Sequence, residues 1–146
     1  MQKIPCLAML CVLVGCSAIS VRAEINGCPK ALEMEALDVA GGTIPDWRAM
    51  HEAFDKYRNC DDGAIGEGFS DAVVRLLANK WQDLEILGAL TNTDGNFEEF
   101  VIKHINETAA ERDLRSVHAN SKACSGPYKA LCEKIHNRAN DALSSM

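Results

Sequence analysis

The sequence predicts an all-α fold, a compact bundle of five or six short helices with two disulfides. Three observations support this prediction. Apolar residues recur at spacings of three and four along most of the chain after residue 43. No segment alternates apolar and polar residues as a half-buried strand would. Four cysteines remain when the first 23 residues are set aside, and 146 residues suit one domain.

The first 23 residues have the pattern of a secretory signal peptide. Lys3 supplies a positive start, an apolar stretch runs over residues 4–19, and Val21 and Ala23 are small enough for a signal peptidase site. The apolar stretch is shorter than the roughly 20 residues of a comfortable membrane span. We therefore expect cleavage after Ala23 and a single domain at 24–146, either periplasmic or secreted.

The same segment allows an alternative interpretation, as a lipoprotein signal. Leu13-Val14-Gly15-Cys16 resembles a bacterial lipobox, in which cleavage precedes a cysteine that becomes lipidated. Cys16 would then anchor the protein in the cell envelope, as in a structural or stress lipoprotein. The membrane is expected to be involved only through the signal or through this anchor.

The cysteines indicate two disulfides. Three of the seven lie in the predicted signal, and an even number in a small exported domain implies pairing. The four that remain are Cys28, Cys60, Cys124 and Cys132. Three connectivities are possible, and we favour Cys28–Cys60 and Cys124–Cys132, because these would clip the N-terminal segment to a helix end and join two successive helices. No zinc-type spacing is present, so no metal is expected.

The first helices follow from start signals and apolar faces. Residues 31–39 are compatible with a short helix ended by Gly41-Gly42. The next starts at 43–46, where a hydroxyl, a proline and an acid occur together, and it ends at 59–60. Its apolar face consists of Trp47, Met50, Phe54 and Tyr57.

The strongest amphipathic pattern opens at Asp61 and Asp62 and continues to the region of Trp81. Its inner side is formed by Ile65, Phe69, Val73, Leu76 and Leu77. Gly63, Gly66 and Gly68 occupy its first two turns, where each glycine costs about 1 kcal/mol relative to alanine. Close approach of a neighbouring helix would explain them, and so would room for a partner or ligand.

Two more helices are predicted around the Asp94-Gly95 turn. The first is short, covering residues 84–90, and a break follows at 91–96. Asn96 and Glu99 form a capping-box pattern at the start of the second.

The last two helices have start signals of their own. Thr108 and Glu111 repeat the capping-box pattern, and Pro127 is suited to the first position of the final helix. No repeat, low-complexity tract or interdomain linker interrupts the chain.

Charge narrows the class of partner. Without residues 1–23, the 13 basic and 21 acidic residues give a net charge of −8. Binding to a phosphate backbone requires clustered Lys and Arg, so a nucleic-acid partner is not expected. A negative domain attracts cationic proteins over long range. We expect a protein partner of that kind.

The candidate contact residues are four acids at the start of the strongest helix, Asp61, Asp62, Glu67 and Asp71. The two aspartates before the helix are expected to cap it, and Glu67 and Asp71 are spaced to share one face. Such acids can cap and solvate a helix, meet a basic partner, or act as a carboxylate pair in glycoside hydrolysis. Since the eight aromatic residues mostly fall on core faces, a sugar-binding site is not favoured.

No catalytic or cofactor motif accompanies these acids, so the protein is not expected to be an enzyme or to hold a cofactor. The four histidines, His51, His104, His118 and His136, are spread one to a helix. His104 and His118 are the two that could converge, but a metal site would need a third ligand. They are expected to be surface or boundary residues.

One stretch resembles a known family. Cys60 through Ala72, CDDGAIGEGFSDA, is similar to a helix of Rap/Tai-type immunity proteins of bacterial type VI secretion, with a cysteine, spaced glycines and an Asp-Ala. The resemblance implies a small, exported, helical, disulfide-bonded inhibitor of peptidoglycan amidases. The chain departs from the family at Ala64, where an aromatic is usual, and in the close spacing of its last two cysteines. Uncharacterised exported bacterial proteins carry a similar acidic, glycine-containing helix.

The expected function is therefore that of an exported helical binding or inhibitor protein, such as an immunity protein that neutralises a cell-wall hydrolase. The alternative is the envelope lipoprotein anchored through Cys16. An envelope hydrolase would need a deep polar cleft joining Glu67 or Asp71 to a histidine. A carrier of apolar ligands would need a large internal cavity.

Overall fold

The computed structural model describes residues 27–146. The predicted signal, its cleavage site and Cys16 lie outside these residues. The described chain is all-α, as predicted, but it has seven α-helices rather than five or six, and it contains no strand. The helices are α1 (Lys30–Gly41), α2 (Trp47–Tyr57), α3 (Gly63–Asn79), α4 (Leu84–Thr93), α5 (Gly95–Lys103), α6 (Glu111–Lys122) and α7 (Lys129–Ser144).

The break predicted at 91–96 is much shorter in the structure. Helix α4 continues to Thr93, and Asp94 alone separates it from α5. The carboxylate of Asp94 accepts hydrogen bonds from the backbone N–H groups of Asn96 and Phe97 at 3.0 and 3.1 Å. Asp94 is therefore the N-cap of α5, in place of the predicted Asn96.

Two other predicted helix starts also differ. Asp46, and not Thr43, caps α2 by accepting from two backbone N–H groups at 3.0 Å. The hydroxyl and backbone N–H of Thr108 both donate to the Asn106 side chain, so Thr108 closes a turn two residues before Ala110, the N-cap of α6.

The final helix starts later than predicted. Its first residue is Lys129, and Tyr128 occupies the N-cap position, which leaves Pro127 in the preceding turn. Gly126 in that turn has φ of +92°, a conformation that glycine adopts readily.

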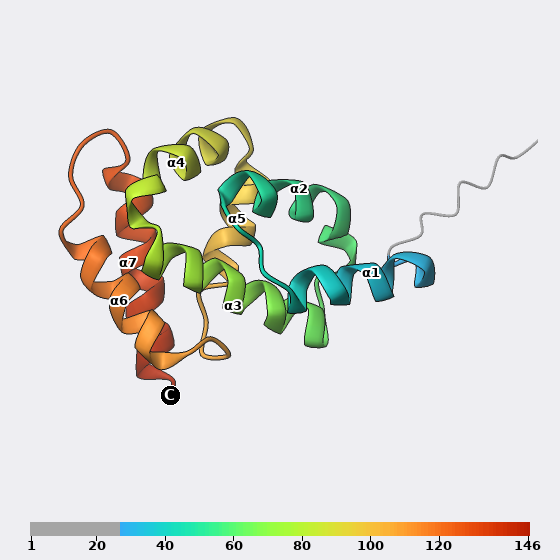
Figure 1. Ribbon diagram of the computed structural model, residues 1–146. Coiled ribbons are helices and arrows are strands. Elements are labelled where there is room, and N and C mark those ends of the chain that lie inside the picture. Colours follow the sequence, from blue (N-terminus) through green and yellow to red (C-terminus); the bar gives the residue numbers. More distant parts are fainter. Residues whose placement is uncertain (1–26) are drawn as a thin grey trace, which may run out of the picture.

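Helix α3 runs through the middle of the molecule (Figure 1). The hairpin of α6 and α7 packs on it at one end, and α1 packs on it at the other. Helices α2, α4 and α5 form the remaining side of the core. The fully buried side chains include Trp47, Met50, Phe69, Phe97, Leu87 and Ile135.

The glycines of α3 allow a close helix–helix approach. A Cβ atom at Gly68 would lie 2.7 Å from the carbonyl oxygen of Ala40, near the end of α1. A side chain at this position would push the two helices apart. Of the two explanations for these glycines, packing accounts for Gly68.

Two disulfides fasten the fold. Cys28 is bonded to Cys60, which ties the start of α1 to the short 3₁₀ turn Arg58–Cys60 that precedes α3. Cys124 is bonded to Cys132, which ties the loop after α6 to α7. This is the pairing favoured from the sequence. Two disulfides are typical of proteins in a non-reducing environment.

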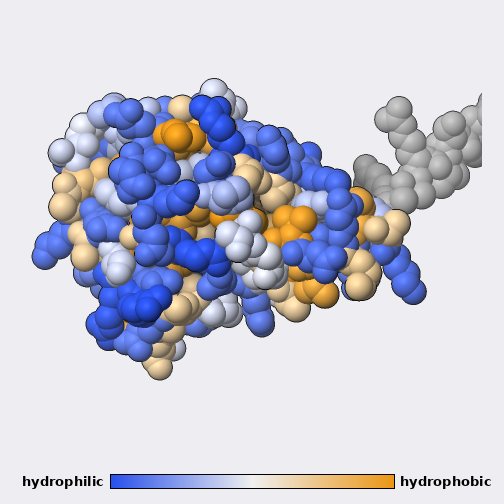
Figure 2. Space-filling view, viewed as in Figure 1, coloured by the Kyte–Doolittle hydropathy of each residue, from blue (hydrophilic) through white to orange (hydrophobic). Residues whose placement is uncertain are grey.

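The surface is mostly hydrophilic in the view of Figure 2, with small hydrophobic patches, one of them on the side where α1 lies. Three large apolar side chains are exposed in residues 27–146, namely Met34, Leu37 and Met146. None of the seven helices is long and apolar enough to cross a membrane.

Candidate functional site

The four predicted acids do not form one surface. Asp62 caps α3 by accepting from the Gly63 N–H at 2.8 Å, as predicted, and Glu67 is exposed one turn later. Asp71 is exposed but forms an ion pair with Arg75 on the same helix. Asp61 does not cap the helix, because its side chain is 8% exposed and turns towards the end of α5. Within the described chain, Asp62 and Glu67 form no ion pair.

Asp61 is held by two residues that lie more than 40 positions further along the chain. Its Oδ2 accepts from Lys103 Nζ at 2.7 Å and from His104 Nε2 at 3.0 Å. Burial raises the pKa of Asp61, but the hydrogen bonds from His104 and Lys103 outweigh burial and hold that pKa below its usual value. The carboxylate is therefore charged at neutral pH, and its buried Oδ1 has no hydrogen-bond partner among residues 27–146.

The network continues into the core through His104. His104 Nε2 lies 3.0 Å from the Asp61 carboxylate, and its other ring nitrogen, Nδ1, lies 2.9 Å from the Ser70 hydroxyl. Asn106 Nδ2 donates to the same hydroxyl oxygen at 2.9 Å. The side chains of α3 and α5 and the loop after α5 are thereby joined by polar contacts. His104, expected to be a surface or boundary residue, is in fact buried, with only 2% of it exposed.

The hydrogen-bonded chain from Ser70 through His104 to Asp61 contains the three residue types of a Ser–His–Asp hydrolase triad. The Ser70 hydroxyl is nevertheless not placed for nucleophilic attack. Ser70 is 1% exposed and lies inside α3, where its hydroxyl is also within 3.0 Å of the Gly66 carbonyl oxygen. A nucleophile needs an open approach and nearby donors for the developing oxyanion. The arrangement is a buried polar network that fixes the position of Asp61.

A shallow pocket of about 260 Å³ lies against this network. Its charged lining consists of three carboxylates, Asp61, Asp62 and Glu67, and one ammonium group, that of Lys103. We call it the α3 acidic pocket. It connects Glu67 with His104, as the hydrolase alternative requires, but it is open and the imidazole is buried beneath it.

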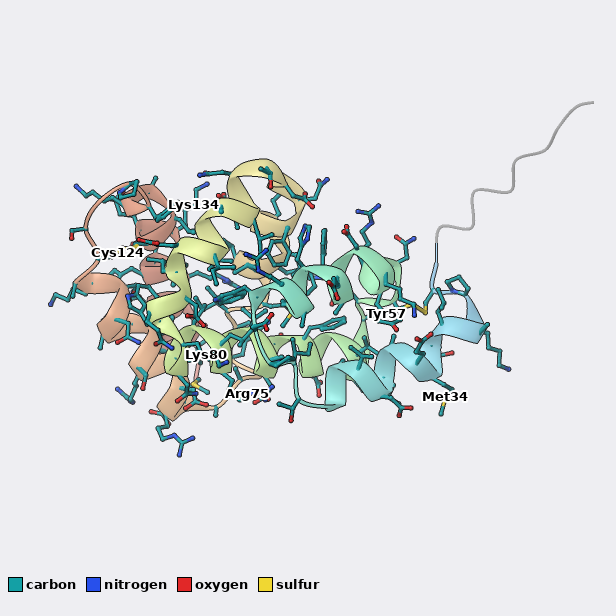
Figure 3. All side chains as sticks on the ribbon, turned by 45° about the horizontal axis from the view of Figure 1, so that its top comes forward. Met34, Tyr57, Arg75, Lys80, Cys124 and Lys134 are labelled. Atoms are coloured by element: carbon teal, nitrogen blue, oxygen red, sulfur yellow. A yellow bond between two sulfur atoms is a disulfide. The ribbon has the colours of Figure 1, made fainter. Side chains whose placement is uncertain are left out.

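A larger groove of about 660 Å³ lies on the other side of the same helix start. Its walls are α1, the Cys28–Cys60 disulfide and the first residues of α3, and its lining includes Glu33, Met34, Leu37 and Asp62. We call it the α1/α3 groove. Met34 is 67% exposed and points away from the body of the protein (Figure 3). Asp62 lines both the groove and the α3 acidic pocket.

A second histidine–carboxylate cluster was missed from the sequence. His51 Nε2 lies 3.1 Å from Asp94 Oδ2, and Asp55 Oδ2 lies 4.0 Å from the other ring nitrogen. The hydrogen bond from His51 and those from the backbone of Asn96 and Phe97 hold the pKa of Asp94 below its usual value, against a smaller opposing effect of burial. The spacing of His51 and Asp55 is visible in the sequence, but nothing local indicates Asp94. These contacts link α2 to the start of α5.

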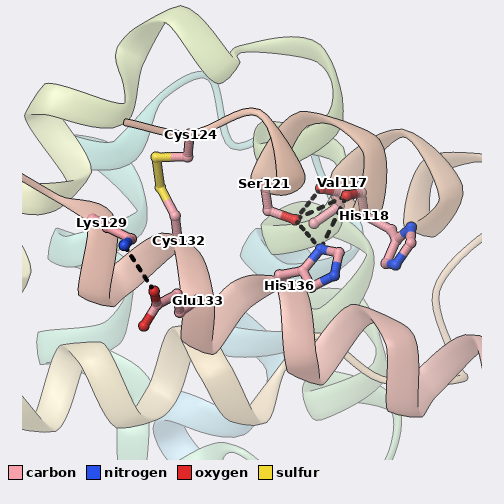
Figure 4. Close-up of a disulfide and its surroundings, with 8 residues drawn as sticks. All are labelled: Val117, His118, Ser121, Cys124, Lys129, Cys132, Glu133 and His136. Carbon is pink, nitrogen blue, oxygen red and sulfur yellow. Dashed lines mark hydrogen bonds and ion pairs between the residues drawn. A yellow bond between two sulfur atoms is a disulfide. The ribbon is translucent and has the colours of Figure 1, made fainter. Parts of the chain in front are cut away.

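His104 and His118 do not pair with each other. The ring of His118 stacks on that of His136 with centroids 4.3 Å apart, between α6 and α7 (Figure 4). His136 Nδ1 lies 3.3 Å from both the Ser121 hydroxyl and the His118 carbonyl oxygen. Burial lowers the pKa of His118, and the positive charges of His136 and Lys122 lower it further.

No protein-family model, curated protein or solved structure matches the chain.

Proposed function

We propose that the protein is an exported binding protein that inhibits a cationic protein partner, and that it binds this partner through the α1/α3 groove. The observation that carries the proposal is the exposure of Met34 and Leu37 at 67% and 40%. Apart from the C-terminal Met146, these are the large apolar side chains that residues 27–146 leave exposed, and both line this one groove. Exposed apolar side chains that gather in one place with a polar rim are typical of interaction sites.

Charge supports a cationic class of partner. Glu33 and Asp62 line the same groove, and Glu67 lies just beyond it on α3. The chain as a whole is acidic. A groove lined by both exposed apolar side chains and carboxylates suits a basic protein surface that also presents apolar side chains. The acids would speed the encounter, and burial of Met34 and Leu37 would supply much of the affinity.

Inhibition of a cell-wall hydrolase is the most specific form of this proposal. It is supported by the resemblance of the stretch at 60–72 to periplasmic immunity proteins, by the two disulfides, and by the small acidic domain. An immunity protein needs no catalytic group of its own, because it acts by occupying the surface of its target.

Capture and inhibition together test the proposal. The full chain is expressed through an oxidising compartment, purified with its disulfides formed, and used to capture envelope and secreted proteins at low and high salt. We expect one basic hydrolase to bind stoichiometrically, to be weakened by salt, and to lose peptidoglycan hydrolysis when the protein is added. A captured partner that keeps its full activity in the complex would refute the inhibitor role.

A groove variant and a control variant test whether the partner binds at the α1/α3 groove. Met34→Ser combined with Leu37→Ser should weaken binding of the purified partner by about tenfold or more, since two apolar side chains leave the interface. Met146→Ser is the matched control, because Met146 is 57% exposed but does not line the groove. Equal affinity of the groove variant and the control would show that the partner binds elsewhere.

A further inference from the structure

A histidine and two carboxylates converge where α2 passes the junction of α4 and α5. His51, Asp55 and Asp94 each offer one ligand atom, and these three atoms lie within 4.8 Å of one another. His51 and Asp55 are one turn apart on α2, the spacing at which two side chains of a helix can bind the same ion. Asp94 lies 43 positions after His51 in the chain. We call this group the His51 site.

Two of the three ligand atoms already have the spacing that one metal ion requires. His51 Nε2 lies 3.1 Å from Asp94 Oδ2, and two ligand atoms of a tetrahedral zinc ion are about 3.2–3.5 Å apart. A point between three atoms that lie within 4.8 Å of one another is at most about 2.8 Å from each, and zinc bonds are about 2.0–2.2 Å long. A small movement of one side chain would therefore complete the site.

Asp55 is the side chain that can make this movement. Its Oδ2 lies 4.0 Å from His51 Nδ1, and the side chain is 55% exposed. Its other oxygen lies 3.8 Å from Arg58, and an exposed ion pair of this kind contributes little to stability. Asp55 can therefore rotate onto an ion that the other two ligands hold.

His51 and Asp94 are held in place by groups outside the site. The His51 ring packs edge-on against Phe97, with the ring centroids 4.7 Å apart. Asp94 Oδ1 accepts from the backbone N–H groups of Asn96 and Phe97, while Oδ2 faces His51. Supporting contacts of this kind orient metal ligands and strengthen metal binding.

The donor set selects the ion. An imidazole nitrogen and carboxylate oxygens are ordinary zinc ligands, whereas calcium and magnesium prefer about six or more oxygen ligands. The two carboxylates also match the charge of a divalent ion. Since the side chains of His51 and Asp94 are 23% and 24% exposed, water can reach the remaining coordination position.

We propose that the His51 site binds a zinc ion, with His51 Nε2, Asp94 Oδ2 and the Asp55 carboxylate as its protein ligands. The ion would join α2 to the N-cap of α5. The sequence predicted no metal because the third ligand lies far along the chain from the other two. This inference is independent of the proposed function, because zinc binding requires no protein partner.

Zinc titration tests the site directly. The protein, purified with its disulfides formed and without a polyhistidine tag, is titrated with zinc chloride by calorimetry, and the histidine ring nitrogens are followed by NMR. We expect saturable binding of one ion per chain, shifted His51 ring resonances, and no displacement by a roughly 100-fold excess of magnesium. Absence of saturable binding, displacement by magnesium, or shifts confined to the rings of His118 and His136 would each overturn the inference.

Removal of one ligand separates the site from general attraction of cations to an acidic protein. Asp55→Asn leaves the cap of α5 intact and should weaken zinc binding at least about tenfold, since loss of a group that merely supports a ligand already has an effect of that size. Asp141→Asn, at an exposed acid on α7, is the matched control and should bind zinc as the unmodified protein does. Equal zinc affinity of the two variants would overturn the assignment of three ligands.

A stronger ligand at the same position gives the converse test. Asp55→His places a second imidazole one turn after His51 and should bind zinc more tightly than the unmodified protein. Zinc should also raise the melting temperature of the unmodified protein, because the ion binds the folded chain, and should raise that of Asp55→Asn less. Weaker zinc binding by Asp55→His, or an equal rise in melting temperature for Asp55→Asn, would show that the ion binds elsewhere.

Discussion

The hydroxyl of Ser70 lies 2.9 Å from Nδ1 of His104, although 34 residues separate them in the sequence. Both side chains are buried, and the contact joins α3 to the end of α5. Through His104 the contact reaches Asp61, and through the hydroxyl oxygen it reaches Asn106. The position of the α3 acidic pocket therefore depends on a polar network inside the core.

Removal of the Ser70 hydroxyl should destabilise the protein. In Ser70→Ala, the buried His104 Nδ1 loses its partner, and Asn106 Nδ2 keeps only its bond to the Lys103 carbonyl, so we expect the free energy of unfolding to fall by about 1–3 kcal/mol. Urea unfolding followed by circular dichroism measures the change. Ser144→Ala is the control, because its hydroxyl donates to a helix carbonyl at the exposed C-terminal end, and it should change stability by less than about 0.5 kcal/mol. Equal effects of the two variants would show that the network adds nothing to stability.

The approach of α1 to α3 at Gly68 gives a second prediction. Alanine is favoured over glycine inside a helix by about 1 kcal/mol, yet a Cβ atom at Gly68 would lie 2.7 Å from the backbone of Ala40. The backbone cannot move aside cheaply, so Gly68→Ala should lower the free energy of unfolding by about 1–3 kcal/mol. Hydrogen exchange of the α1 amides should become faster.

Gly95→Ala serves as the control for this prediction. Gly95 is the first residue of α5, and no atom lies within 4 Å of where its Cβ would be. We expect this variant to be neutral or slightly stabilising. A Gly68→Ala protein as stable as Gly95→Ala would mean that α1 is not packed tightly on α3.

The sequence alone was enough to predict the features that depend on local patterns. The apolar spacing of Trp47, Met50, Phe54 and Tyr57 predicted one buried face, and the structure buries all four. Asp62 was predicted as a cap because an acid directly before a helix can reach its free N–H groups, and it does. The sequence left three disulfide connectivities open, and the structure contains the one that was favoured.

Local sequence patterns could not predict the contacts between residues that lie far apart in the chain. Asp61 has the same sequence context as Asp62 and was assigned the same role, but Lys103 and His104 bind it from more than 40 residues away. The break at 91–96 was predicted from turn-forming residues. Thr91 is instead buried, and its hydroxyl donates to the Gly88 carbonyl, so tertiary burial extends α4 across residues that favour a turn.

The two disulfides should differ in their contribution to stability. Cys28–Cys60 spans 32 residues and Cys124–Cys132 spans 8. If each acts mainly by restricting the unfolded chain, the longer loop contributes about 1 kcal/mol more. Replacement of both cysteines of a pair by serine, in separate variants, allows the comparison by urea unfolding. The larger loss is expected for Cys28→Ser with Cys60→Ser, and the opposite order would show that native contacts of the α6–α7 loop dominate.

The stacked pair of His118 and His136 should make stability depend on pH. Burial, His136 and Lys122 lower the pKa of His118 in the folded state, so the unfolded chain binds a proton more readily. The contribution of His118 to stability is therefore fully present above its unfolded pKa of about 6.5 and is lost progressively as the pH falls below that value. The free energy of unfolding should decrease between about pH 7.5 and about pH 5, and His118→Gln should make this decrease shallower. Added salt should reduce the part caused by His136 and Lys122 but not the part caused by burial. Urea unfolding at several pH values measures the slope, and an unchanged slope in His118→Gln would assign the pH dependence to other groups.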